Sequence, residues 1–97
     1  MSKPAILIVD DDAIILDSLC EFLKIEGYTT CSASTIAQAH KKLTEQTFAL
    51  VITDVNMPDG DGFEILETVR RQYPRTVVIM ITGSLRSSGS AFTFSRT

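Results

Sequence analysis

Carboxylates are concentrated at two places in the chain, each directly after a short apolar segment. Asp10, Asp11 and Asp12 follow the first segment, and Asp54 follows a later one. Carboxylates in such positions are hard to explain as solvated surface, because ionised groups beside buried apolar chain are costly to desolvate. If these side chains meet, they repel one another unless a cation neutralises them or some are protonated. Hard oxygen ligands in an incomplete set favour Mg²⁺, and a carboxylate beside such a metal is a candidate phosphoryl acceptor.

The segments that must position these aspartates alternate between strand-like and helix-like patterns. Apolar or β-branched runs predict strands at residues 5–9, 28–33, 48–52 and 76–81. Helical spacing of apolar residues predicts helices at residues 13–26, 35–46 and 63–73. This alternation predicts an α/β domain with a doubly wound parallel sheet and helices on both faces. Ligands of such sheets bind beyond the carboxyl ends of the strands, where Asp10, Asp54 and Thr82 stand.

Several polar residues near these positions also have structural interpretations. Asp12 is expected to cap the helix that follows it. Asp59 and Asp61 lie among glycines and are predicted to be turn residues. Phe63 is predicted to face inward from the third helix, which Pro74 prevents from continuing.

Composition limits the classes of protein that this chain can represent. Its 97 residues, 44% of them hydrophobic and 22% charged, are typical of one globular domain rather than a disordered chain. A net charge of −3 argues against direct nucleic-acid binding, and no apolar run is long enough to span a membrane. Cys20 and Cys31 match no metal or redox spacing, which predicts reduced thiols in a cytoplasmic protein.

Three pieces of the chain, taken in order, resemble the receiver domain of two-component response regulators. They are the apolar strand into Asp10-Asp11, the stretch Asp54-x-x-Met57-Pro58-x-x-Asp61-Gly62, and the strand into Thr82-Gly83. The resemblance covers residues 5–84. It implies a flavodoxin-like sheet with strand order 2-1-3-4 over the part present here, and a receiver domain at residues 1–84.

The resemblance also implies roles for individual residues. Asp54 would accept a phosphoryl group from a sensor histidine kinase or phosphotransfer protein. Asp11 would bind Mg²⁺ or Mn²⁺ directly, Asp10 chiefly through water, and the backbone carbonyl of Asn56 would add a ligand beside Asp54. Thr82 would donate its hydroxyl to the phosphoryl group and act as a switch. Such a domain is a bacterial, cytoplasmic signalling acceptor and not a turnover enzyme.

The C-terminal part departs from the family pattern. The family continues into a fifth βα unit whose strand carries a lysine, whereas the last lysine here is Lys42. Residues 85–97 form a Ser- and Phe-rich tail, which we interpret as a truncated, frameshifted or disordered end. Without further strands, the strand at 76–81 is expected to be an open sheet edge that favours a homodimer or strand exchange. The alternation at 91–94 predicts a substitute edge strand.

Two other functions remain open at this level. A phosphohydrolase of the haloacid dehalogenase type is similar in its first strand, and would use Asp10 as nucleophile and Asp12 as acid/base. Against it, the chain lacks that family's downstream lysine and paired acids, and Asp54 would have no role. The second alternative is a degenerate receiver that acts only as a binding module. In such a module, titration with divalent ions would show no Mg²⁺ dependence at the acidic cluster.

Overall fold

The computed structural model describes residues 4–82 and 91–96, with the backbone alone at residue 82 and at residues 91–96. The helices are α1 (Ala13–Ile25), α2 (Ile36–Glu45) and α3 (Gly62–Gln72). The strands are β1 (Ala5–Val9), β2 (Thr29–Ala33), β3 (Leu50–Asp54), β4 (Asn56–Met57), β5 (Gly60–Asp61), β6 (Val77–Thr82) and β7 (Ala91–Arg96). The described helices and the long parallel strands lie within a residue or two of the ranges that periodicity predicts, which is the usual uncertainty at element ends.

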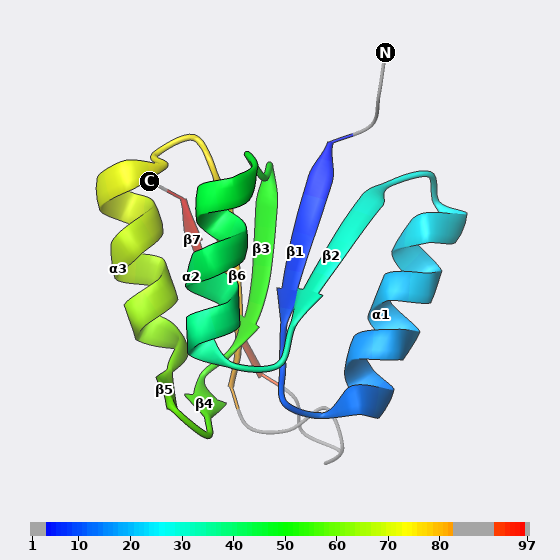
Figure 1. The fold of residues 1–97 in the computed structure, drawn as a ribbon, viewed down its shortest axis with the longest axis horizontal. Helices are drawn as coiled ribbons and strands as arrows, with labels where there is room; N and C mark the ends of the chain where they lie inside the picture. Colours follow the sequence, from blue (N-terminus) through cyan, green and yellow to red (C-terminus); the bar gives the residue numbers. More distant parts are fainter. Residues whose placement is uncertain (1–3, 83–90, 97) are drawn as a thin grey trace.

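The main sheet has the order β2-β1-β3-β6-β7 (Figure 1). β2, β1, β3 and β6 are parallel to one another, and β6 corresponds to the predicted fourth strand. The predicted α/β fold and the strand order 2-1-3-4 are therefore confirmed. β1 and β3 lie side by side although a helix-strand-helix passage separates them in the chain, so their carboxyl ends meet at one edge of the sheet.

β7 extends this sheet beyond β6. It runs antiparallel to β6, from the pair Thr82 and Ala91 to the pair Val77 and Arg96. The substitute edge strand is thus confirmed, whereas the expectation of an open edge along β6 is wrong, because β7 takes up that hydrogen-bonding edge. Strand exchange through β6 was expected only because of that open edge, so this expectation no longer has a structural basis. Residues 85–90 and 97 of the predicted tail lie outside the described residues, and the domain boundary at residue 84 stays a prediction.

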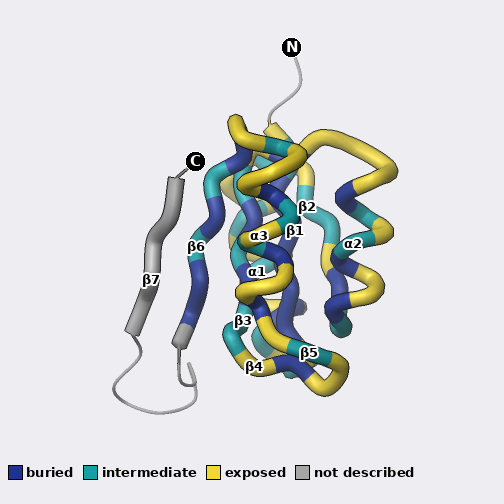
Figure 2. Tube along the Cα trace, turned by 90° about the vertical axis from the view of Figure 1, so that its left-hand side faces the viewer, coloured by how far each residue is buried: buried dark blue, intermediate teal, exposed yellow. Residues whose placement is uncertain are grey.

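The helices cover the two faces of the sheet unequally (Figure 1). α2 and α3 pack on one face, where Leu7, Val51 and Val78 belong to the larger apolar cluster together with the buried side chains of both helices. α1 packs on the other face, where Leu16 contacts the side chains of Ile6 and Ile8. Figure 2 shows the same division along the chain, with buried strand residues inside and exposed residues on the outer surfaces of the helices.

Side-chain caps begin all three described helices. Asp12 accepts hydrogen bonds from the backbone N–H of Ile14 (2.9 Å) and of Ile15 (3.3 Å), which confirms the cap predicted for α1. Thr35 caps α2 in the same way, and Asp61 forms a capping box with Glu64 at the start of α3. Each of these caps comes from the residue directly before its helix.

One core prediction is wrong. Phe63 is 52% exposed, while Ile65 and Val69 are fully buried against the sheet. Phe63 lies in the first turn of α3, and the i, i+4 pair of Ile65 and Val69 directs the buried side of the helix elsewhere. Among the described residues no helix is both long and apolar enough to cross a membrane.

Candidate metal centre

Three carboxylates meet beyond the carboxyl ends of β1 and β3. Asp10, Asp11 and Asp54 each contribute one oxygen to a group whose members all lie within 4.8 Å of one another. The pairing of β1 with β3 brings them together, because Val9 is in register with Thr53 and the aspartates follow directly. The cluster predicted from the sequence is therefore present, and its oxygens are of the type that Mg²⁺ or Mn²⁺ binds.

Asp10 is the buried member of this cluster, with only 4% of its surface exposed. Burial raises the pKa of its carboxyl above the ordinary value of 3.8, and the charges of Asp54 and Asp11 raise it further. The backbone N–H of Asp12 opposes this effect by donating a 2.8 Å hydrogen bond to Asp10 Oδ1. A divalent cation at the cluster would relieve the repulsion that these groups exert on one another, so the residues present fit such an ion.

The other two carboxylates are more accessible. Asp11 is exposed and Asp54 is half-buried at the end of β3. Asp54 Oδ1 accepts a hydrogen bond of 3.3 Å from the backbone N–H of Asn56, which orients the carboxylate toward the loop that follows. Solvent exposure therefore increases from Asp10 through Asp54 to Asp11. A phosphorylated molecule could approach the cluster from its exposed side.

The backbone around Asp54 is held by a set of hydrogen bonds that sequence reasoning missed. The Thr53 hydroxyl donates to the Asp54 carbonyl oxygen (3.0 Å). The N–H of Val55 donates to the Ile81 carbonyl (3.2 Å), and the N–H of Gly62 donates to the Val55 carbonyl (2.7 Å). A Cβ at Gly62 would collide with the Asp54 carbonyl oxygen. Two features of the sequence could have indicated this arrangement. They are a hydroxyl residue inside an apolar strand and a glycine at the start of α3.

The loop after Asp54 folds into the β4-β5 hairpin, which holds the start of α2. Asp59 accepts hydrogen bonds from the backbone N–H groups of Ile36 (2.8 Å) and Ala37 (3.1 Å). These two amides lower the pKa of Asp59 below 3.8. Asp59 and Asp61, predicted as simple turn residues, are therefore both helix caps, and Asp59 acts on a helix more than twenty positions away in the chain.

The remaining predicted site residues have different locations. Asn56 follows β3 closely and is exposed in β4. Thr82 ends β6, one residue beyond the Ile81 that pairs with Asp54, but its side chain lies outside the described residues, as does Gly83. Asp12 does not join the carboxylate group, because it caps α1. The bonds from Ile14 and Ile15 engage one carboxylate oxygen of Asp12, which counts against the acid/base role that a haloacid dehalogenase site would give it.

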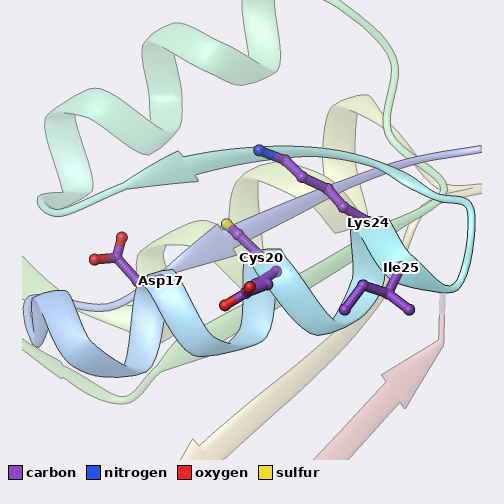
Figure 3. Close-up of a pocket in the computed structure, with 5 residues that line it drawn as sticks. Asp17, Cys20, Lys24 and Ile25 are labelled. Atoms are coloured by element: carbon purple, nitrogen blue, oxygen red, sulfur yellow. The ribbon is translucent and has the colours of Figure 1, made fainter.

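A concave surface lies along α1 (Figure 3). It is a hollow of about 370 Å³, lined by Asp17, Cys20, Glu21, Lys24 and Ile25. All five side chains come from one helix, and they include both signs of charge. No residue of the carboxylate cluster lines this hollow, so the cluster remains the candidate site for metal chemistry.

Comparison with known sequences gives consistent matches. The family described as the response regulator receiver domain matches residues 6–91. The response regulator protein PilR of Pseudomonas aeruginosa is 37% identical over 87 residues, which are 88% of this chain and 20% of PilR. The transcriptional regulatory protein BasR of Escherichia coli is 34% identical over 77 residues, which are 79% of this chain and 35% of BasR. The chain thus spans about a fifth to a third of the length of these relatives.

Solved structures give the same result. A CheY-like receiver domain protein from Methanospirillum hungatei matches with a TM-score of 0.81 at 40% identity, over 87% of this chain and 69% of that one. The beryllofluoride-activated receiver domain dimer of NtrC4 matches with a TM-score of 0.76 at 41% identity, over 84% of this chain and 69% of that one.

Proposed function

The chain belongs to the response regulator receiver domain family, and from this membership we propose that Asp54 accepts a phosphoryl group from a phosphohistidine. The donor would be a sensor histidine kinase or a phosphotransfer protein of a two-component system. The observation that carries the proposal is the meeting of Asp10, Asp11 and Asp54 within 4.8 Å at the carboxyl edge of the sheet. The relatives are bacterial regulators, and we propose a cytoplasmic bacterial setting for this chain as well.

In the proposed reaction a carboxylate oxygen of Asp54 attacks phosphorus. A new O–P bond forms, the N–P bond to the donor histidine breaks, and the released imidazole nitrogen takes a proton from solvent. Mg²⁺ bound by Asp11, Asp54, the Asn56 carbonyl and, through water, Asp10 would supply positive charge to the transferring oxygens. The hydrogen bond from the Asn56 amide to Asp54 Oδ1 orients the attacking carboxylate.

The product is an acyl phosphate on the protein itself, so the chain acts as an acceptor and not as a turnover enzyme. The Thr82 hydroxyl is proposed to contact the new phosphoryl oxygens.

Treatment with acetyl phosphate, with and without Mg²⁺, tests this function. We expect intact-mass analysis to show the gain of one phosphoryl group, dependent on Mg²⁺, and peptide mapping to place it on Asp54. Asp54→Asn should abolish the gain, and Asp12→Asn should keep it. A phosphoryl group on Asp10 would favour the phosphohydrolase alternative. Absence of both phosphorylation and Mg²⁺ binding would favour the degenerate binding module.

A further inference from the structure

Thr53 is buried next to Asp54 in β3, and we infer that it is a positioning residue for Asp54. Its hydroxyl would hold the peptide group that links Asp54 to Val55, and so fix where the Asp54 carboxylate and the Asn56 carbonyl stand. The inference rests on the proposed function, since it assigns Thr53 a part in preparing the same metal and phosphoryl site.

The buried position of Thr53 restricts the hydrogen bonds that its hydroxyl can make. The residue is fully buried, in register with Val9 of β1 on one side and Met80 of β6 on the other. A hydroxyl in such surroundings must find a hydrogen-bond partner or pay a desolvation cost. Thr53 Oγ1 donates to the Asp54 carbonyl oxygen at 3.0 Å, so the bond is made to the backbone of the acceptor residue itself.

The same carbonyl is enclosed from the side of α3. Gly62, the first residue of α3, stands so close that a Cβ there would collide with the Asp54 carbonyl oxygen and approach Met80 Cε to 3.1 Å. Val55, the next residue, makes two further backbone hydrogen bonds, and its N–H belongs to the same peptide group as the Asp54 carbonyl. Val55 donates to the Ile81 carbonyl at 3.2 Å and accepts from the Gly62 amide at 2.7 Å. The Thr53 hydroxyl completes this set on the strand side.

The position of this peptide matters for the site because two proposed metal ligands depend on it. The Asp54 side chain leaves the backbone just before the peptide, and the Asn56 carbonyl comes two residues later. Rotation of the peptide would displace both oxygens relative to Asp10 and Asp11. Residues that orient metal ligands typically contribute about 10- to 100-fold in metal affinity. We expect the low end of this range for Thr53, because the bonds of Val55 and Gly62 would remain.

Thr76 provides a matched control within the same protein. It is also buried, and its hydroxyl donates to a backbone carbonyl, that of Phe48, at 2.6 Å. Thr76 precedes β6, whereas Thr53 lies next to the last residue of β3, so the two bonds stand near opposite ends of the parallel strands. Removing either hydroxyl deletes the same kind of interaction, but only Thr53 adjoins the carboxylate cluster.

The experiment compares Thr53→Val, Thr53→Ser and Thr76→Val with the unmodified chain. Mg²⁺ dissociation constants are measured by isothermal titration calorimetry. Exchange of the Val55 and Asn56 amides is measured by NMR in metal-free protein. We expect Thr53→Val to weaken Mg²⁺ binding by about 10-fold and to speed exchange at both amides. Thr53→Ser should restore both properties, and Thr76→Val should leave both unchanged.

Equal Mg²⁺ affinity and equal exchange in Thr53→Val and the unmodified chain would overturn the inference. Equal effects of Thr76→Val would overturn it as well, since they would indicate a general loss of stability. If Thr53→Val does not fold, Thr53→Ala removes the hydroxyl with less steric demand and is judged in the same way. If the unmodified chain binds no Mg²⁺, the proposed metal site fails, while the exchange measurement still decides the role of Thr53.

Discussion

The substitution Asp10→Asn tests whether the carboxylate cluster destabilises the folded protein when no cation is bound. Asn keeps the oxygen that accepts the Asp12 N–H at 2.8 Å, but it removes the buried charge. We expect the metal-free variant to be more stable than the unmodified chain at neutral pH. A substitution that improves stability while damaging the proposed function is typical of a site in which like charges are held together to bind a ligand.

The magnitude follows from the distances in the cluster. Asp10 and Asp11 are neighbours in the chain, so part of their repulsion persists in the unfolded state and cancels. The repulsion between Asp10 and Asp54 exists only in the folded protein. At the 4.8 Å limit of the cluster it amounts to about 0.9 kcal/mol in a water-like dielectric and about 3.5 kcal/mol at an effective dielectric constant of about 20. Because Asp54 is half-buried, we expect a gain of about 1–3 kcal/mol.

Urea unfolding followed by circular dichroism measures this gain. The raised pKa of Asp10 determines how the gain in stability depends on pH. The folded state holds the Asp10 proton more tightly than the unfolded state does. The ionised carboxyl therefore reduces stability fully above its folded pKa, and the reduction disappears as the pH falls to the ordinary value of 3.8. The two proteins should converge in acid. Saturating Mg²⁺ should stabilise the unmodified chain by about 2.7 kcal/mol at a hundred times its dissociation constant, and it should stabilise the variant less.

Glu67→Gln is the matched control, because it removes one negative charge from an exposed position of α3 outside the cluster. It should change stability by less than about 0.5 kcal/mol. A metal-free Asp10→Asn protein that is no more stable than the unmodified chain at neutral pH would refute the reasoning. So would a gain that persists unchanged in acid, because the charge of Asp10 could then not be its cause.

Two further predictions concern the backbone around the site. Gly62→Ala places a Cβ against the Asp54 carbonyl oxygen, and we expect urea unfolding to show a loss of about 1–3 kcal/mol together with weaker Mg²⁺ binding by calorimetry. Unchanged values of both would show that α3 can move away without cost. Asp59→Ala removes the cap on the first two amides of α2 and should lower the melting temperature in a calorimetric scan. Because the pKa of Asp59 is lowered, its contribution is present above pH 3.8 and is lost as the pH falls through the lowered pKa, so a difference that persists below that pKa would contradict this origin.

Much of the fold was predictable because local rules act over a few residues. The spacing of apolar residues predicts the helices, and the short apolar runs predict strands that are buried on both faces. Asp12 was predictable as a cap, since a cap bonds to amides two or three positions later. The placement of Asp10, Asp11 and Asp54 at strand ends also follows from the chain, because a parallel sheet collects its carboxyl ends at one edge.

Contacts between distant segments were beyond such rules. Phe63 and Ile65 are both apolar residues of one helix turn, and only the packing of α3 on the sheet decides that Ile65 is buried. Asp59 has the sequence context of a turn residue, yet it reaches the start of α2 because the hairpin folds back against that helix. β7 could be predicted as a strand from its alternation, but its pairing with β6 depends on which edge of the sheet is available.

The amino-acid sequence by itself determined the order of the elements, the helix caps made within one turn, and the presence of three acidic residues suited to a divalent cation. Only the tertiary structure decided how closely those acids stand, that Asp10 is the buried one, and that Thr53 and Gly62 enclose the Asp54 carbonyl. The physical reason is the range of the interactions. Periodicity and capping depend on neighbours in the chain, whereas burial, repulsion and steric contact depend on distances that exist only after β1, β3 and α3 have packed together.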